Sequence, residues 1–155
     1  MRKKKFVLGF TLIELLLAVS IVGILSTILV VAVNPGRQLA KARDSQRQTD
    51  LIAILAAVMQ YASEHSGDLP DTDGNPNTSN FPTTPTCIGS GTSCFNLAEA
   101  GEEGEKIVPV YMLSIPKDPR TGDETDTGYT IYVDENGHLH ASATGEVTAT
   151  ITAER

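Results

Sequence analysis

The chain has 155 residues, 41% of them hydrophobic, which is enough for one modest globular domain and an appendage. The formal charge of −7 hides an asymmetry, because four of the twelve basic residues lie together at positions 2–5 and the other eight stand against nineteen acidic ones. An acidic body of this kind argues against a nucleic-acid backbone as the main partner, since phosphate binding needs a basic surface. We therefore expect no nucleic acid as the main partner.

Residues 10–33 form an apolar run of 24 positions in which Glu14 is the only charged side chain. As a helix this run is about 36 Å long, and a bilayer core is about 30 Å thick. The alternative is a cleaved secretory signal peptide, but the run is long for one and no clear A-x-A cleavage site ends it. We predict a transmembrane helix, and we expect a function for Glu14 because an unpaired charge in hydrocarbon is costly.

An Asn-Pro-Gly sequence at 34–36 interrupts the helical pattern. Pro35 has no amide hydrogen and disfavours helix in the residue before it, so we expect a kink or a locally unwound turn. An amphipathic helix is predicted from this break to residue 65. Its apolar stripe is expected to contain Leu51, Leu55, Val58 and Ala62, with Ile52 and Met59 beside it. The charged residues Arg43, Arg47, Asp50 and Glu64 are expected to lie off that stripe.

Residues 66–106 are predicted to be a loop, because turn-forming residues dominate them as far as about Ser93. Cys87 and Cys94 lie within this loop, on either side of a Gly/Ser-rich stretch that lets the two sulfur atoms meet. An even number of cysteines in an exported domain indicates a disulfide. The alternative is two free thiols in a reducing cytosol.

The C-terminal region, residues 107–155, is predicted to hold three antiparallel strands that cover the amphipathic helix. Their apolar residues are expected to be Tyr129, Ile131 and Val133; Leu139, Ala141 and Ala143; and Val147, Ala149 and Ile151. A three-residue hairpin loop with Gly137 in the left-handed conformation pairs Val133 with Leu139 and puts these side chains on one face. A two-residue Asn136-Gly137 turn would break that match. The predicted fold is thus α+β, with a long N-terminal transmembrane and amphipathic helix packed on a small three-stranded antiparallel sheet.

The stretch GFTLIELLLAVSIVGIL resembles the start of a type IV pilin or type II secretion pseudopilin precursor. The family pattern is a short basic leader that ends in glycine, then phenylalanine, then Thr-Leu-x-Glu at the start of a long apolar helix. It falls on Gly9, Phe10, Thr11, Leu12 and Glu14. Two later stretches, GDLP at 67–70 after Tyr61 and IPKDP at 115–119, also resemble the major pseudopilins and short bacterial pilins.

The resemblance implies that residues 1–9 are a leader peptide. A membrane-embedded aspartyl prepilin peptidase would cut between Gly9 and Phe10 and methylate the new amino group of Phe10. In a filament, Glu14 would pair with that amine on a neighbouring subunit, and each of these charges would neutralise the other. The expected location is the cytoplasmic membrane, with a single span and the C-terminal domain outside, and then the filament. The expected partners are the prepilin peptidase, an inner-membrane assembly platform, the membrane and other copies of the chain.

The expected function is therefore that of a structural subunit of a type IV pilus or a type II secretion pseudopilus. The sequence does not distinguish these two filaments. The alternative is a membrane-anchored minor pilin that acts as an adhesin or captures DNA, with the loop from Asp71 to Cys94 carrying recognition. An enzyme is third, because the sequence has no catalytic motif and no triad spacing. We expect no catalytic site and no cofactor.

Three segments have partial features of metal sites. Alternate oxygen-bearing residues in DTDGNPN suggest a calcium loop, but Pro76 and Pro82 occupy positions that a calcium loop needs for glycine and for a ligand. The segment 118–126 lies where major pseudopilins carry calcium, but the acidic C-terminal loop typical of those proteins is missing. His138 and His140 project to one side of a predicted strand and offer half of a metal site without a recognisable third ligand. We predict no metal site.

Overall fold

The computed structural model describes residues 9–75 and 78–155, and it divides the chain after Leu39 into an N-terminal unit and a compact C-terminal unit. Residues 1–8 of the predicted leader, and Pro76 and Asn77 of the DTDGNPN segment, lie outside the described residues. The side chains at positions 32 and 33 are also outside them. The fold is α+β, as predicted.

The helix α1 spans Leu12–Val33, and its residues as far as position 31 are exposed. It ends at Asn34, whose left-handed backbone (φ 45°, ψ 78°) cannot continue a right-handed helix. The next helix, α2, spans Pro35–Glu64. Proline is tolerated as its first residue, because the amide hydrogen that proline lacks would have no partner within the helix at that position. The Asn-Pro-Gly sequence thus separates two helices.

The end of α2 is closed by a left-handed segment. Ser66 and Gly67 both have positive φ, and the amide of Gly67 donates to the carbonyl of Ala62 at 2.8 Å. Such a closure satisfies carbonyls in the last turn that have no partner within the helix.

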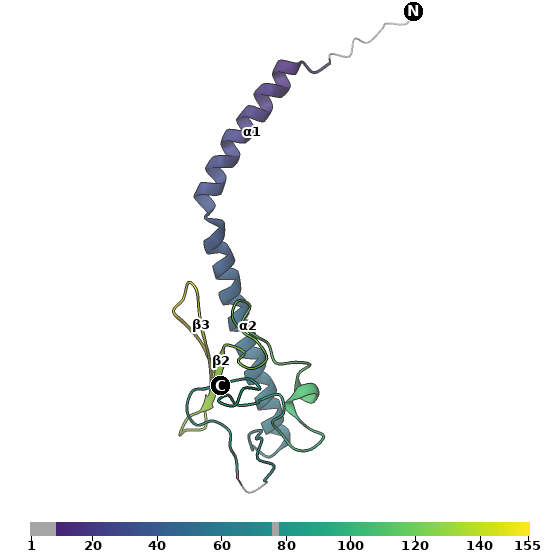
Figure 1. Ribbon diagram of the computed structural model, residues 1–155, viewed down its shortest axis with the longest axis vertical. Helices are drawn as coiled ribbons and strands as arrows, with labels where there is room; N and C mark the ends of the chain where they lie inside the picture. Colours follow the sequence, from purple (N-terminus) through teal and green to yellow (C-terminus); the bar gives the residue numbers. More distant parts are fainter. Residues whose placement is uncertain (1–8, 76–77) are drawn as a thin grey trace, which may run out of the picture. The chain divides into compact units, whose positions relative to one another are not determined.

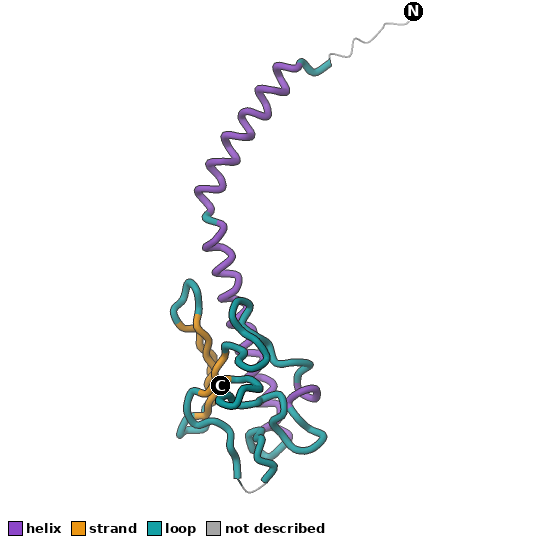
Figure 2. The backbone as a smooth tube through the Cα atoms, viewed as in Figure 1, coloured by secondary structure: helices purple, strands orange, loops and turns teal. Residues whose placement is uncertain are grey.

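The sheet has four antiparallel strands in the order β1-β2-β3-β4. Their bounds are Thr86–Cys87 for β1, Tyr129–Val133 for β2, Leu139–Thr144 for β3 and Thr150–Glu154 for β4. Figure 2 shows the strands gathered in one place, with loops forming much of the rest of the compact unit. The predicted number of three strands was wrong, because the two-residue strand β1 is too short to produce a periodic pattern within a loop sequence.

The hairpin between β2 and β3 has the predicted register. Val133 pairs with Leu139, and the amide of Asp134 donates to the carbonyl of His138 at 2.9 Å. Gly137 has a φ of 85°, as the three-residue loop requires. Tyr129 and Ile131 are buried together with all three apolar residues of β3, so one face of the hairpin enters the core.

The last strand begins later than expected. Val147 and Ala149, which were predicted to lie in it, belong to the turn before Thr150, and Val147 is exposed. The turn is fixed by Asp44, whose carboxylate accepts the amides of residues 146–148 at 2.8 to 3.1 Å. Ile151 is buried as predicted and pairs with Ala143.

The core of the compact unit combines α2, the sheet and the long loop. The long loop, predicted from its turn-forming residues, also contributes to the core, because Phe81 and Ile88 are buried there. The same loop region contributes three more buried core residues, Phe95, Leu97 and Ala100. A short helical turn, η1 (Ile107–Tyr111), adds the buried side chain of Ile107.

The buried face of α2 also differs from the predicted stripe. Leu51, Ile54, Leu55, Ala57, Val58 and Tyr61 are buried, whereas Ile52 and Met59 are exposed. The buried face continues toward the N-terminus through Asp50, Arg47 and Asp44, at the spacing of a helical face. The prediction that Arg47 and Asp50 lie off the stripe was wrong, because these charged groups have partners inside the fold.

Candidate processing and assembly site

Gly9 and Phe10 precede α1 in a segment without regular structure, and both are exposed. The side chain of Phe10 is 81% exposed. A Cβ added to Gly9 would meet no atom within 4 Å, so no described side chain or backbone crowds the peptide bond at the glycine. In the described chain, therefore, the predicted processing site is accessible.

Glu14 lies one turn into α1, and its carboxylate turns back to the start of the helix. Its Oε2 atom accepts hydrogen bonds from the backbone nitrogen of Thr11 at 2.9 Å and from the Thr11 hydroxyl at 2.7 Å. The hydroxyl oxygen of Thr11 in turn accepts the amide of Glu14 at 3.3 Å. This is a capping box, which satisfies two amides that have no partner within the helix.

The capping box places the carboxylate beside the nitrogen of Thr11, one residue after Phe10. Sequence reasoning gave Glu14 a partner on another subunit and missed this local partner. The signal was present in the spacing of Thr11 and Glu14, since Thr-x-x-Glu before an apolar run is typical of a helix start.

One helix among the described residues, over Leu12–Val31, is long and apolar enough to cross a membrane, and none of it is buried by other described residues. Its hydroxyl groups have partners within the helix. Ser20 and Ser26 each donate to the carbonyl four residues earlier at 2.7 Å, and Thr27 does so at 3.0 Å. A helix in lipid must satisfy its polar groups in this way, because hydrocarbon offers no partners.

In the compact unit, Arg47 joins α2 to two loops. Its guanidinium binds both carboxylate oxygens of Asp118 at 2.5 and 3.1 Å, and it also contacts Asp44 at 2.8 Å and Glu146 at 3.1 Å. Arg47 is only 2% exposed. Arg43 adds two hydrogen bonds of 2.6 Å to Glu146.

These contacts favour the ionised carboxylates. The hydrogen bond from the backbone amide of Glu146 is the main cause of the lowered pKa of Asp44. The amides of residues 147 and 148 and the side chain of Arg47 lower this pKa further. Burial alone would raise the pKa of Asp118, but Arg47 and the amides of residues 120 and 121 outweigh it and lower that pKa. The hydrogen bonds from Arg43 lower the pKa of Glu146 to about 2.

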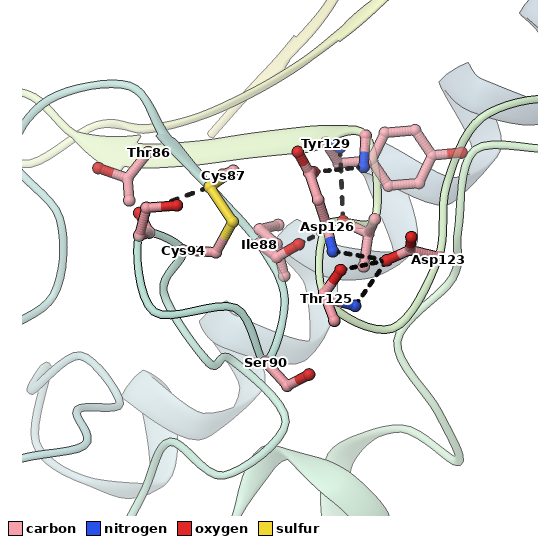
Figure 3. The surroundings of a disulfide bond; sticks show 12 residues. Thr86, Cys87, Ile88, Ser90, Cys94, Asp123, Thr125, Asp126 and Tyr129 are labelled. Carbon is pink, nitrogen blue, oxygen red and sulfur yellow. Dashed lines mark hydrogen bonds between the residues drawn. A yellow bond between two sulfur atoms is a disulfide. The ribbon is translucent and has the colours of Figure 1, made fainter.

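A disulfide joins Cys87 and Cys94 in the structure (Figure 3). The backbone of the closed loop is also held by hydrogen bonds from the amides of Ser90 and Gly91 to the carbonyls of residues 124 and 125, each at 2.9 Å. Both sulfur atoms lie within 4.8 Å of a carboxylate oxygen of Asp126. Sulfurs bonded to each other offer no thiolate, so this group has no metal-binding character.

Residues 4–30 match the family described as the prokaryotic N-terminal methylation motif. This match covers Lys4 and Lys5 of the basic residues before the apolar run, the Gly9-Phe10 bond, the capping box and most of α1. No curated protein and no solved structure matches the chain significantly.

Proposed function

Because residues 4–30 carry the prepilin-type signal of type IV pilins and pseudopilins, we propose that the chain is a subunit that polymerises through its N-terminal helix into a type IV pilus or a type II secretion pseudopilus. The motif indicates a structural protein. The observation that carries the proposal is the position of this signal at the start of an apolar helix that other described residues leave uncovered. Such a helix needs lipid before assembly and other copies of itself afterwards.

Processing is the first step. A prepilin peptidase cuts the exposed bond between Gly9 and Phe10, removes the leader of residues 1–9 and methylates the new amino group. Before the cut, the nitrogen of Phe10 is part of an uncharged peptide bond. After the cut it is a cation next to an apolar side chain, and this cation needs a negative partner wherever water is excluded.

Glu14 supplies that partner. Within one chain its carboxylate lies at the Thr11 amide, one residue from Phe10, so the carboxylate already faces the end of the helix where the cation is created. In the filament the carboxylate binds the Phe10 amine of a neighbouring subunit. A subunit added in the wrong register would leave both charges buried without a partner, which is strongly unfavourable.

The subunit reaches the filament from the cytoplasmic membrane. The apolar helix and the signal suggest membrane anchoring and a pilus-type assembly. We propose a single span with the compact unit outside, and an inner-membrane assembly platform as a further partner. The disulfide between Cys87 and Cys94 agrees with an exported unit, because such bonds persist in oxidising compartments.

The proposal is tested by isolating filaments from cells that contain the full assembly machinery and measuring the N-terminus of the subunit by mass spectrometry. We expect filaments that contain the chain, beginning at a methylated Phe10. The matched control is Gly9→Val, which places a branched side chain at the bond to be cut and should leave the precursor in the membrane. A chain that keeps residues 1–9 in filaments, or that never leaves the membrane although it is processed, would contradict the proposal.

A further inference from the structure

An acidic loop at residues 102–105 carries three glutamates within four residues, and all four residues are exposed. Backbone hydrogen bonds fix the chain just before and just after it. The amide of Gly101 donates to the carbonyl of Asp71 at 2.7 Å, and the amide of Ile107 donates to the carbonyl of Ala100 at 2.9 Å. Between these two anchors, the loop is attached to the rest of the compact unit through side chains at the end of α2.

Two stacked rings, those of Tyr61 and His65, make this attachment. The hydroxyl oxygen of Tyr61 accepts the amide of Glu102 at 3.3 Å, and a Cβ added to Gly101 would come within 3.0 Å of the tyrosine ring. The Nε2 atom of His65 lies 3.0 Å from Oε2 of Glu105. The ring centroids are 3.9 Å apart and the ring planes differ by 6°. Tyr61 thus holds the start of the loop, and His65 holds its last residue.

The contacts of His65 define the protonation state in which it holds the loop. Its Nδ1 atom lies 2.9 Å from the backbone carbonyl oxygen of Tyr61, and its Nε2 atom faces the carboxylate of Glu105. A carbonyl and an ionised carboxylate can only accept hydrogen bonds, so each ring nitrogen needs its own proton. A neutral ring carries one N–H and would turn a lone pair toward one of the two oxygens. His65 therefore makes both contacts only as a cation, and a position just after the end of α2 favours a cation.

The surroundings of the ring are mostly acidic. Glu64 accepts the hydroxyl of Tyr111 at 2.9 Å, and Lys106 forms an ion pair with Glu99. The titratable side chains on the neighbouring elements, besides those of Tyr61 and Glu105, are those of Glu64, Asp68, Asp71, Lys106, Tyr111 and the other two glutamates of the acidic loop. Because the nearby lysine is already paired with Glu99, the protonated ring of His65 supplies the positive charge that Glu105 contacts.

We infer that His65 is a pH-sensitive latch, which fastens the acidic loop to the end of α2 as a cation and releases Glu105 when it loses its proton. Histidine is the side chain that ordinarily changes charge between about pH 5 and 8. The backbone anchors on either side of the loop do not depend on this proton, so the release is confined to the acidic loop and leaves the core in place. The latch is independent of the proposed polymerisation.

The test is a pH titration of the full-length ¹⁵N-labelled protein in detergent, followed by nuclear magnetic resonance from about pH 5.5 to 8, the range in which histidines titrate. We expect both ring nitrogens of His65 to be protonated at the acid end. As the ring loses its proton, the amide signals of residues 102–105 should shift with the same midpoint. In Glu105→Ala the ring should still titrate, but this shift of the loop amides should be lost. In His65→Gln the shift should be lost as well.

The matched control is His138→Asn, which removes a histidine that is 63% exposed on the β2–β3 hairpin and should leave the response of the acidic loop unchanged. The side chain of Glu105 is 58% exposed, so Glu105→Ala tests the latch without disturbing the core, and circular dichroism checks this. A His65 ring with an unprotonated nitrogen at the acid end would overturn the inference. Loop amides that respond to pH equally in Glu105→Ala and the wild type would also overturn it.

Discussion

Gly89 and Gly91 show how single residues position the disulfide loop. Both lie against the backbone of Thr125, and a Cβ on Gly89 would come within 2.2 Å of the Thr125 carbonyl oxygen. At Gly91 the corresponding distance is 2.7 Å. The loop can make its hydrogen bonds to residues 124 and 125 only because these two positions lack side chains.

The first prediction concerns Gly89→Ala. The added methyl group would collide with backbone rather than with a flexible side chain, so the loop must move and lose its bonds to residues 124 and 125. We expect the free energy of unfolding of the compact unit to fall by about 1 to 3 kcal/mol, as for other overpacked sites. Urea denaturation followed by circular dichroism measures this.

The control is Thr92→Ala in the same loop, where the side chain is exposed and the effect on the free energy of unfolding should stay within about 0.5 kcal/mol. Equal stability of Gly89→Ala and Thr92→Ala would contradict the prediction.

At the scale of elements, Arg47 connects α2 with the segment around Asp118 and with the turn before β4. These parts are far apart in the sequence and meet through one buried guanidinium. Asp44 strengthens the same junction, because it binds Arg47 and three amides of that turn. On this part of α2, buried ion pairs rather than apolar side chains hold the helix to the neighbouring loops.

The second prediction is that Arg47→Met is strongly destabilising. Methionine fills part of the space but leaves Asp118 buried without its cation, and breaking a buried pair in this way costs about 3 to 5 kcal/mol. The control is Arg120→Met, since Arg120 contacts Glu146 at 3.4 Å but is 65% exposed and should matter little. Thermal unfolding of both variants checks this. A similar melting temperature for the two variants would show that Arg47 does not hold the junction.

The third prediction concerns the loop closed by Cys87 and Cys94. On the chain-entropy account a ring of eight residues stabilises the fold by about 2.5 kcal/mol. We expect a loss of this size in the double variant Cys87→Ser, Cys94→Ser, measured by urea denaturation. Adding a reductant should lower the stability of the wild type and leave the variant unchanged. A wild type that is insensitive to reduction would refute a stabilising bridge.

The sequence predicted elements well where the periodicity was carried by apolar residues. The two helices and the register of the β2–β3 hairpin are of this kind, the latter because only the three-residue loop pairs Val133 with Leu139 and puts the apolar residues of both strands on one face. Prediction failed where burial was carried by other residues. Arg47 was placed off the apolar stripe because a charged side chain is rarely buried, and its partners Asp118 and Glu146 are distant in the sequence. At the N-terminus the motif identified Glu14, and the Thr-x-x-Glu spacing that indicates its bond to Thr11 was present in the sequence but was not used.

For the molecule as a whole, the compact unit has its own core, and the apolar helix is exposed over Leu12–Val31. The compact unit is stabilised by ionised carboxylates as well as by apolar burial, and this gives its stability a dependence on pH. The pKa values of Asp44 and Asp118 fall below the ordinary 3.8, and that of Glu146 falls from 4.5 to about 2.

The fourth prediction follows from the sign of these shifts. A carboxylate whose pKa is lower in the folded state binds fewer protons there, so its contribution is complete above about pH 5 and is lost as the pH falls from 4.5 toward 2. We expect the melting temperature to be nearly constant from about pH 5 to 7 and to fall steeply below about pH 4.5. In Asp118→Asn, which is less stable at neutral pH, the fall should be shallower. A melting temperature that rises on acidification would contradict this account.

The most direct measurement of the central claim compares the yield of filaments with the amount of membrane-bound subunit for the wild type, Glu14→Leu and Glu14→Gln. Leucine removes both the charge and the bonds to Thr11, whereas glutamine keeps an oxygen that can accept those bonds and removes only the charge. Both variants should enter the membrane, because losing a charge lowers the cost of insertion. If Glu14 neutralises the Phe10 amine of a neighbouring subunit, both variants yield few or no filaments. Filaments at the wild-type level in Glu14→Gln would show that only the helix cap matters, and would contradict charge pairing as the basis of assembly.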